Sequence, residues 1–235
     1  MKKGNYENGP AKIIVFAGLD ASGKKTQSEK LRDKFISLGA SAIIVSYPTY
    51  DKTLFGMLID FVLKSKFATL FLGPFSFANT DPLAGSLLYS ADRRQDLPRL
   101  RELMEKYDIL IFDRYVEANV VHQGGKIKDD AAKLRFAETI MHIEYDLLEL
   151  PRPDVTFYLD APLEVSMDRA HKRAEEKGET PDTVELDLQY VSNSYTAGHF
   201  FAREFKWEVI STSSEGTFLS PDKIHQKVCE SLGVE

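Results

Sequence analysis

The residues with the clearest chemical pattern are the nine from Gly18 to Thr26, GLDASGKKT. They follow an apolar run and open a stretch with helical periodicity. Glycines in such a turn let backbone N–H groups point at phosphate oxygens, and the start of the helix favours negative charge. The pattern predicts a phosphate-binding loop made of Gly18, Leu19, Asp20, Ala21, Ser22, Gly23, Lys24, Lys25 and Thr26.

Lys25 is unusual, because this position of the loop commonly carries a magnesium-binding hydroxyl. A charged lysine has no lone pair and cannot bind a metal ion. Thr26 supplies a hydroxyl one residue later, and GKKTQ resembles the GKGTQ of adenylate kinases, which hold magnesium largely through water and phosphate oxygens. We therefore expect a working loop. Two alternatives stay open, a Lys25 that points into solvent and a degenerate loop.

The elements that must position this loop alternate between strands and helices. Apolar runs rich in β-branched or aromatic residues predict strands at residues 12–18, 41–47, 108–113, 154–160 and 207–212. Their near-continuous hydrophobicity is typical of parallel strands that are covered on both faces. Helical stretches lie at residues 23–38, 83–107, 131–150, 163–177, 184–203 and 221–232. This alternation predicts a doubly wound α/β fold, with residues 67–82 as a loop or insert.

Composition excludes several classes of function. A chain of 235 residues with 43% hydrophobic residues suits one domain, and its net charge of −6 argues against a binder of nucleic acid polymers. A single cysteine, Cys229, excludes a disulfide framework and is predicted to lie in the core. The polar start MKKGNYENGP has no signal core, and no apolar run is long enough to cross a bilayer. We therefore expect a cytoplasmic protein without a membrane partner.

A second candidate site is FDRY, residues 112–115, at the carboxyl end of the third predicted strand. Ligands bind at this edge of open α/β sheets. Asp113 could hold a metal-bound water, and Arg114 could bind phosphate through its planar fork. Taken alone, the pair is explained equally well by a structural salt bridge.

Five segments strengthen the prediction when they are read together. The order and spacing of these segments resemble those of the thymidylate kinase family, from about Lys12 to Val228. The segments are GLDASGKKTQ, YPTY, SADRRQ, DRYVEANVVHQGG and LPRPDVTFYLDAP. The resemblance implies a P-loop NTPase-like three-layer α/β fold, with a five-stranded parallel sheet flanked by helices. It implies one domain over residues 11–235, a lid at about 169–185 and a polar tail at 1–10. It also implies a homodimer that uses Mg²⁺ and ATP to convert dTMP to dTDP.

The resemblance further implies roles for individual residues. Asp20 would lie beside the acceptor phosphate, Arg93 would grip that phosphate, and Arg114 would lie between donor and acceptor. The implied catalytic set is Lys24, Asp20, Arg114, Arg169 and Arg173. The implied dTMP-binding set is Pro48, Tyr50, Tyr89, Arg93, Arg114, Asn119 and Gln123. Asp113 and Thr26 are the candidates for the metal.

Ordinary structural roles explain many of these residues as well. The alternatives are a packed aromatic for Tyr89, a solvated face for Arg93 with Arg94, an exposed polar helix face for Asn119 with Gln123, and an exposed charged helix for Arg169 with Arg173. His122 and His142 stand apart from other metal-like ligands, and we interpret them as packing or surface residues.

Two departures leave the acceptor open. Tyr50 stands where some relatives carry an arginine for the acceptor phosphate, and the insert at residues 67–81 lies near the expected base. Two rival functions therefore remain. One is a kinase of another nucleotide or of a nucleoside on the same fold, and the other is a nucleotide-binding protein without catalysis. Arg93 favours an acceptor that carries a phosphate.

Overall fold

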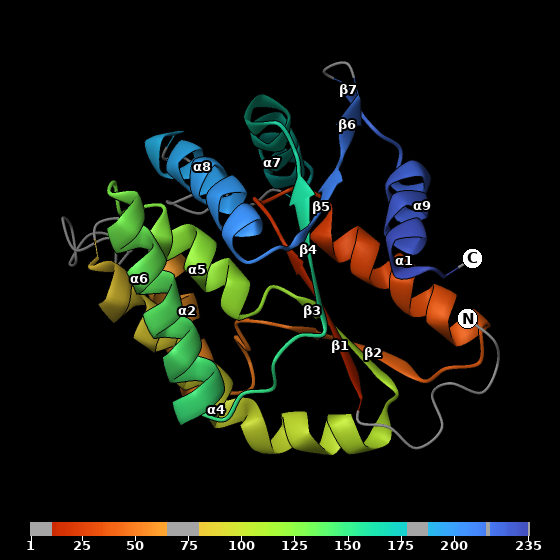
Figure 1. The fold of residues 1–235 in the computed structure, drawn as a ribbon, viewed down its shortest axis with the longest axis horizontal. Helices are drawn as coiled ribbons and strands as arrows, with labels where there is room; N and C mark the ends of the chain where they lie inside the picture. Colours follow the sequence, from red (N-terminus) through yellow and green to blue (C-terminus); the bar gives the residue numbers. More distant parts are fainter. Residues whose placement is uncertain (1–10, 65–79, 178–187, 215–216, 235) are drawn as a thin grey trace.

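The computed structural model describes residues 11–64, 80–177, 188–214 and 217–234, and a five-stranded parallel sheet forms its centre (Figure 1). The strands are β1 (Lys12–Ala17), β2 (Ala42–Ser46), β3 (Ile109–Asp113), β4 (Val155–Asp160) and β5 (Glu208–Ser211). Their spatial order is β2-β3-β1-β4-β5. All five predicted strands and the α/β class are confirmed.

Strand β1 shows why the sheet is covered on both faces. Ile14 and Phe16 belong to one apolar cluster, whereas Val15 and Ala17 belong to another. Successive side chains of a strand point to opposite faces, so a continuous apolar run supplies two cores at once. Helices α1 (Lys24–Ser37) and α9 (Pro221–Leu232) contribute to the first cluster. The second cluster includes residues of α4 (Pro82–Lys106), α5 (Val116–Gly124), α6 (Asp130–Met141) and α8 (Leu188–Glu204).

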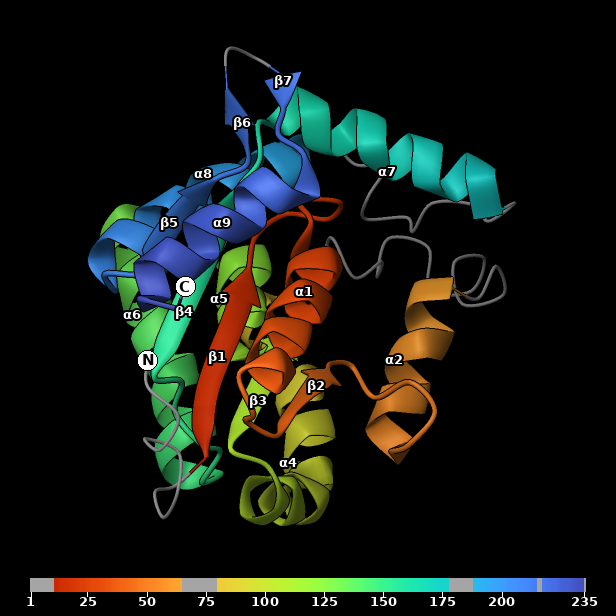
Figure 2. The same ribbon diagram turned by 90° about the vertical axis from the view of Figure 1, so that its right-hand side faces the viewer.

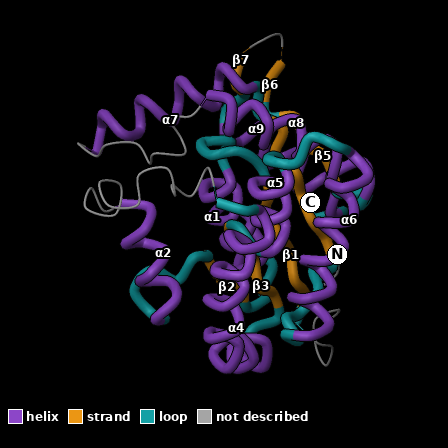
Figure 3. Tube along the Cα trace, turned by 90° about the vertical axis from the view of Figure 1, so that its left-hand side faces the viewer, coloured by secondary structure: helices purple, strands orange, loops and turns teal. Residues whose placement is uncertain are grey.

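Two helices stand outside these layers. Helix α2 (Leu54–Lys64) contacts α4, and α7 (Leu163–Lys177) follows β4. Both project from the same side of the molecule (Figures 2 and 3). A short hairpin of β6 (Ser213–Ser214) and β7 (Thr217–Phe218) precedes α9. In the part of the chain that the structure describes, every helix is too short or too polar to span a membrane.

The predicted helix at residues 131–150 is wrong in one respect. Regular α-helix ends at Met141, and a π-helical turn, η2 (His142–Leu147), follows it. Leu148 N donates to Ile143 O at 2.8 Å, which closes this wider turn. Helix α2 was not predicted at all. The polar tail 1–10, most of the insert and the second half of the lid lie outside the described residues.

Candidate active site

The phosphate loop joins β1 to α1 in the geometry that its glycines predict. Gly18 has φ 138° and Gly23 has φ 103°, conformations that L side chains rarely adopt. A Cβ atom at Gly18 would lie only 2.7 Å from Leu159 O of the neighbouring strand. The loop therefore turns tightly against β4, and the N-terminus of α1 points into the centre of the loop.

Lys24 places a positive charge inside this loop. Its Nζ donates to Gly18 O at 2.9 Å and Leu19 O at 2.6 Å, and it lies 3.9 Å from Asp20 Oδ1. The Lys24 side chain is buried, whereas Lys25 is exposed and Thr26 is half-buried. The exposure of Lys25 agrees with the alternative in which this residue points into solvent, and it leaves the loop free of a second buried cation.

Arg114 links the FDRY motif to the phosphate loop. Its Nη2 forms an ion pair with Asp20 Oδ1, although the two residues are 94 positions apart in the chain. Arg114 adopts a left-handed backbone conformation with φ 68°, which is uncommon for a residue other than glycine. The motif thus makes a salt bridge with the loop, which brings two predicted catalytic residues together.

Asp113 ends β3 beside the same loop. Burial raises the pKa of its carboxyl above the ordinary value of 3.8, and Lys24 and Lys25 partly oppose this effect. Its Oδ1 atom is buried and has no hydrogen-bond partner among the described residues. A buried carboxylate oxygen without a partner suits a metal-bound water, so Asp113 fits the role predicted for it.

The segment after β2 forms the other side of the site. Tyr47 and Pro48 are joined by a cis peptide bond, and Thr49 then binds Asp92 of α4 through both its N–H and its hydroxyl, at 2.9 and 2.5 Å. Tyr50 and Tyr89 pack together with Ile59 and Leu63 in one apolar cluster. The fold therefore gathers Pro48, Tyr50 and Tyr89, and Tyr89 is only partly buried.

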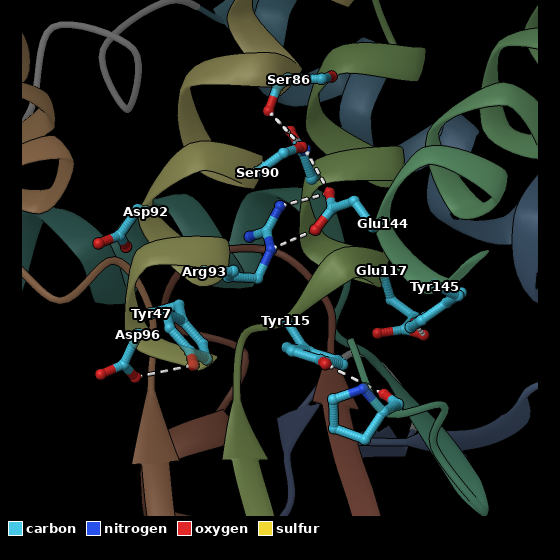
Figure 4. Close-up of polar contacts among 12 residues, drawn as sticks. Tyr47, Ser86, Ser90, Asp92, Arg93, Asp96, Tyr115, Glu117, Glu144 and Tyr145 are labelled. Carbon is cyan, nitrogen blue, oxygen red and sulfur yellow. Dashed lines mark hydrogen bonds and ion pairs between the residues drawn. The ribbon is translucent and has the colours of Figure 1, made fainter. Parts of the chain in front are cut away.

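A buried polar network lies beneath this side (Figure 4). Arg93 of α4 is 2% exposed, and Asn119 and Gln123 of α5 are 5% and 1% exposed. The solvated-face interpretations of these three residues are therefore wrong, although Arg94 is exposed. Arg93 Nε and Nη2 donate to Glu144 Oε2 and Oε1 at 2.5 and 2.6 Å.

Glu117 is a second buried acid in this network. Tyr145 donates its hydroxyl hydrogen to Glu117 Oε1 at 2.6 Å. Burial raises the pKa of the Glu117 carboxyl from its ordinary 4.5 to about 7, against the opposing effect of this hydrogen bond. Sequence reasoning missed Asp92, Glu117 and Glu144. For Glu117 and Glu144 the available signal was an acid placed next to apolar residues, whereas Asp92 stands among polar and charged residues in SADRRQ.

The first part of the predicted lid contacts the phosphate loop. Arg169 of α7 donates from Nε to Ala21 O at 3.2 Å, and its guanidinium lies 4.1 Å from the centre of the Phe218 ring. The side chain of Arg173 lies outside the described part of the chain. His122 stacks on Tyr190 with ring centres 6.0 Å apart, and His142 is exposed and paired with Asp146, as expected for packing and surface residues.

Known proteins are similar to this chain over most of its length. The family model of thymidylate kinase matches residues 16–215. Thymidylate kinase of Mycobacterium tuberculosis is 27% identical over 178 residues, which cover 75% of this chain and 79% of the relative. Thymidylate kinase of one Prochlorococcus marinus strain is 28% identical over 212 residues, which cover 86% and 88%.

Solved structures agree with the fold. A thymidylate kinase from Candida albicans superposes with a TM-score of 0.67 at 20% identity, over 95% of this chain and 92% of that chain. The thymidylate kinase of Ehrlichia chaffeensis superposes with a TM-score of 0.60 at 20% identity, over 95% and 100%. At this identity the likeness establishes the five-stranded α/β architecture.

The matched region runs from within β1, through the phosphate loop and the FDRY motif, to the β6–β7 hairpin. It therefore includes both sides of the site described above. The chain belongs to the thymidylate kinase family, whose members are phosphotransferases that use ATP to convert dTMP to dTDP.

Proposed function

We propose that this chain transfers the γ-phosphate of magnesium-bound ATP to dTMP at the site between the phosphate loop and the FDRY motif. The observation that carries the proposal is the meeting of Lys24, Asp20 and Arg114 at one point. Phosphoryl transfer needs two nucleotides in line and cations that neutralise spreading negative charge. The product is one phosphorylation short of dTTP, which fits nucleotide synthesis in the cytoplasm.

On the donor side, the loop amides and Lys24 would hold the phosphates of ATP. Asp113 and the Thr26 hydroxyl would hold magnesium there, in part through water, and the ion would neutralise phosphate charge. Arg169 already contacts the loop at Ala21 O, so its charge would lie close to the phosphates that the loop holds. Arg173 joins it in the proposal as a second lid arginine.

On the acceptor side, Arg114 is the candidate for the phosphate of dTMP. Its side chain is 35% exposed and its partner Asp20 lies inside the loop, so in the proposal the guanidinium would lie between the two nucleotides. Arg93 was predicted to grip the same phosphate. Its charge is neutralised by Glu144 in a buried pair, which favours a contact with an uncharged oxygen of the base instead.

Asn119 and Gln123 complete the proposed base pocket. Asn119 Oδ1 and Gln123 Oε1 are buried oxygens without a hydrogen-bond partner among the described residues. Such oxygens can accept a hydrogen bond from a ligand N–H, and thymine presents one between two carbonyl oxygens. The half-buried ring of Tyr89 and the segment with Pro48 and Tyr50 would cover the base from the other side.

A coupled assay of ADP release tests this proposal. Purified protein receives magnesium-ATP and one of dTMP, dUMP, dCMP, dGMP or thymidine. Strong turnover with dTMP supports the proposal. Turnover with thymidine or another monophosphate alone would support a kinase of different specificity, and ATP binding without turnover would support a binding protein.

We infer that the active form is a homodimer, in keeping with the family resemblance. Helix α2 carries exposed apolar side chains at a helical spacing, and α4 adds two more beside it: Leu54, Met57, Leu58 and Phe61, with Leu83 and Leu87. Leu54 is 63% and Met57 is 53% exposed, which is unfavourable for a surface that stays in water. A second copy of the same face would cover these side chains symmetrically.

The dimer is tested by light scattering during size-exclusion chromatography. We expect the mass of two chains for the natural protein and of one chain for Leu58→Asp, because a buried charge at the interface is unfavourable. Leu188→Asp, at a leucine of α8 that is also exposed, is the control and should leave the mass unchanged. A natural protein with the mass of one chain would contradict the inference.

A further inference from the structure

Glu144 is a carboxylate with no exposed surface, and none of the roles above includes it. It lies in the π-helical turn η2, directly after α6. A π turn changes the direction in which side chains leave a helix, and such turns frequently occur at functional sites. Figure 4 shows that the Glu144 side chain points from η2 toward Arg93 of α4.

Both oxygens of Glu144 are engaged by residues that we place at the acceptor base. Arg93 donates to both of them through Nε and Nη2, at 2.5 and 2.6 Å. Asn119 Nδ2 donates to Glu144 Oε1 at 3.2 Å and to Ser86 O at 3.2 Å. One acid therefore connects α4, α5 and η2, although Arg93 and Glu144 are 51 positions apart in the sequence.

The carboxylate of Glu144 determines which atoms of Arg93 and Asn119 remain available to a ligand. A guanidinium held through Nε and Nη2 turns Nη1 to the opposite side, as Figure 4 shows. A carboxylate and a carbonyl only accept hydrogen bonds, so Asn119 must turn Nδ2 toward them and Oδ1 away. Oδ1 is the buried oxygen without a partner among the described residues. The result is one fixed donor, Nη1, and one fixed acceptor, Oδ1.

Stability is a weak reason for such an arrangement. Removing two charges from water is unfavourable, and well-packed apolar residues often replace a buried ion pair without loss of stability. A bidentate pair does confer a fixed orientation. Arg93 without Glu144 would be a buried, unpaired cation with freedom to rotate.

We propose that Glu144 is a positioning residue for acceptor recognition, which holds Arg93 and Asn119 in the donor–acceptor arrangement that selects a thymine edge over a cytosine edge. The inference rests on the proposed function, because it assumes that dTMP docks at these two residues. Cytosine has an amino group and an unprotonated ring nitrogen where thymine has a carbonyl and an N–H. The arrangement held by Glu144 therefore matches thymine and opposes cytosine.

Glu144→Gln tests the proposal, with Glu138→Gln as the matched control. Both changes remove one negative charge, but Glu138 is exposed on α6 and touches no part of the site. For Glu144→Gln we expect KM for dTMP to rise about 10- to 100-fold, as for one lost hydrogen bond to a charged group. We expect kcat and KM for ATP to stay near those of the natural protein, and the preference for dTMP over dCMP to fall. Glu144→Asp, which keeps the charge, should recover part of the loss.

A double variant covers the case in which Glu144→Gln does not fold. Arg93→Met with Glu144→Met replaces the pair by apolar side chains, and we expect a folded protein with weak dTMP kinetics and a normal KM for ATP. Normal dTMP kinetics and specificity in a folded Glu144→Gln or double variant would overturn the proposal, as would equal changes in both KM values. If the natural protein does not phosphorylate dTMP, the proposed function fails as well. If it does and Glu144→Gln behaves like Glu138→Gln, only this inference fails.

Discussion

Replacing Glu117 by glutamine should make the protein more stable at neutral and alkaline pH. Glu117 is 2% exposed, and its Oε2 atom is buried without a hydrogen-bond partner among the described residues. Glutamine has the shape of the protonated carboxyl and keeps the oxygen that accepts from Tyr145. The variant therefore removes a buried charge and leaves the contact that holds the side chain.

The magnitude follows from the pKa of Glu117. Its carboxyl titrates at about 7 in the folded protein, against an ordinary value of 4.5, because burial disfavours the charged form. Each pH unit between the two values is equivalent to 1.36 kcal/mol. The natural protein should therefore lose about 3 kcal/mol of unfolding free energy through this group as the pH rises from 4.5 to above 7.

The sign is set by proton binding. Between pH 4.5 and 7 the folded state keeps the Glu117 proton and the unfolded state releases it, so rising pH favours unfolding. Below pH 4.5 the group is protonated in both states and its stabilising effect is fully present. Glu117→Gln does not titrate and lacks this loss.

Urea unfolding at several pH values between 4.5 and 8.5 provides the test. The difference in unfolding free energy between Glu117→Gln and the natural protein should grow by about 3 kcal/mol across this range. Comparing two proteins cancels the titration of all other groups that keep their environment. Glu138→Gln, on an exposed face, should show a constant difference. A constant difference for Glu117→Gln would refute the argument that this carboxyl is buried with a raised pKa.

Two further substitutions address the two sides of the site. Lys24→Met should lower kcat by more than about a hundredfold with an unchanged circular dichroism spectrum, because the loop loses its cation and keeps its fold; appreciable remaining activity would exclude Lys24 from catalysis. Gly56→Ala should raise KM for dTMP several-fold and leave KM for ATP unchanged. The added Cβ would lie 2.2 Å from Thr49 O and displace the segment after β2. Unchanged steady-state kinetics with dTMP would contradict the placement of that segment at the acceptor.

Local patterns were sufficient to predict the donor side of the site. The strand, the glycines, Lys24 and the following helix are contiguous, so each supports the interpretation of the next. The strands of the sheet could also be predicted locally, because a continuous apolar run indicates a strand covered on both faces whatever its neighbours are. Asp113 and Arg114 could be placed at the sheet edge for the same reason.

The acceptor side depends on contacts between distant residues. Arg93 and Glu144 are 51 positions apart, and no local pattern indicates that an arginine in one helix meets an acid in another. Asn119 and Gln123 do share a helix face, as their spacing predicted. That face is buried because Gly85 of α4 lets the Gln123 side chain approach closely, which their spacing alone does not reveal.

Helix α2 and the turn η2 were missed for a common reason. Helix α2 exposes several of its apolar side chains, so its pattern does not resemble that of a helix packed on a monomer core. The turn at η2 follows α6 without a proline or glycine to interrupt the periodic pattern. In both cases the sequence shows which positions are apolar, but it does not show which residues cover them in the folded protein.

Direct transfer of labelled phosphate tests the central claim. The protein is incubated with magnesium and with ATP that carries radioactive phosphorus at the γ position, in the presence or absence of dTMP, and the products are separated by chromatography. The account predicts that the label appears in dTDP when dTMP is present, and that Lys24→Met abolishes this transfer. Label that stays in ATP, or that appears only as inorganic phosphate, would contradict the account.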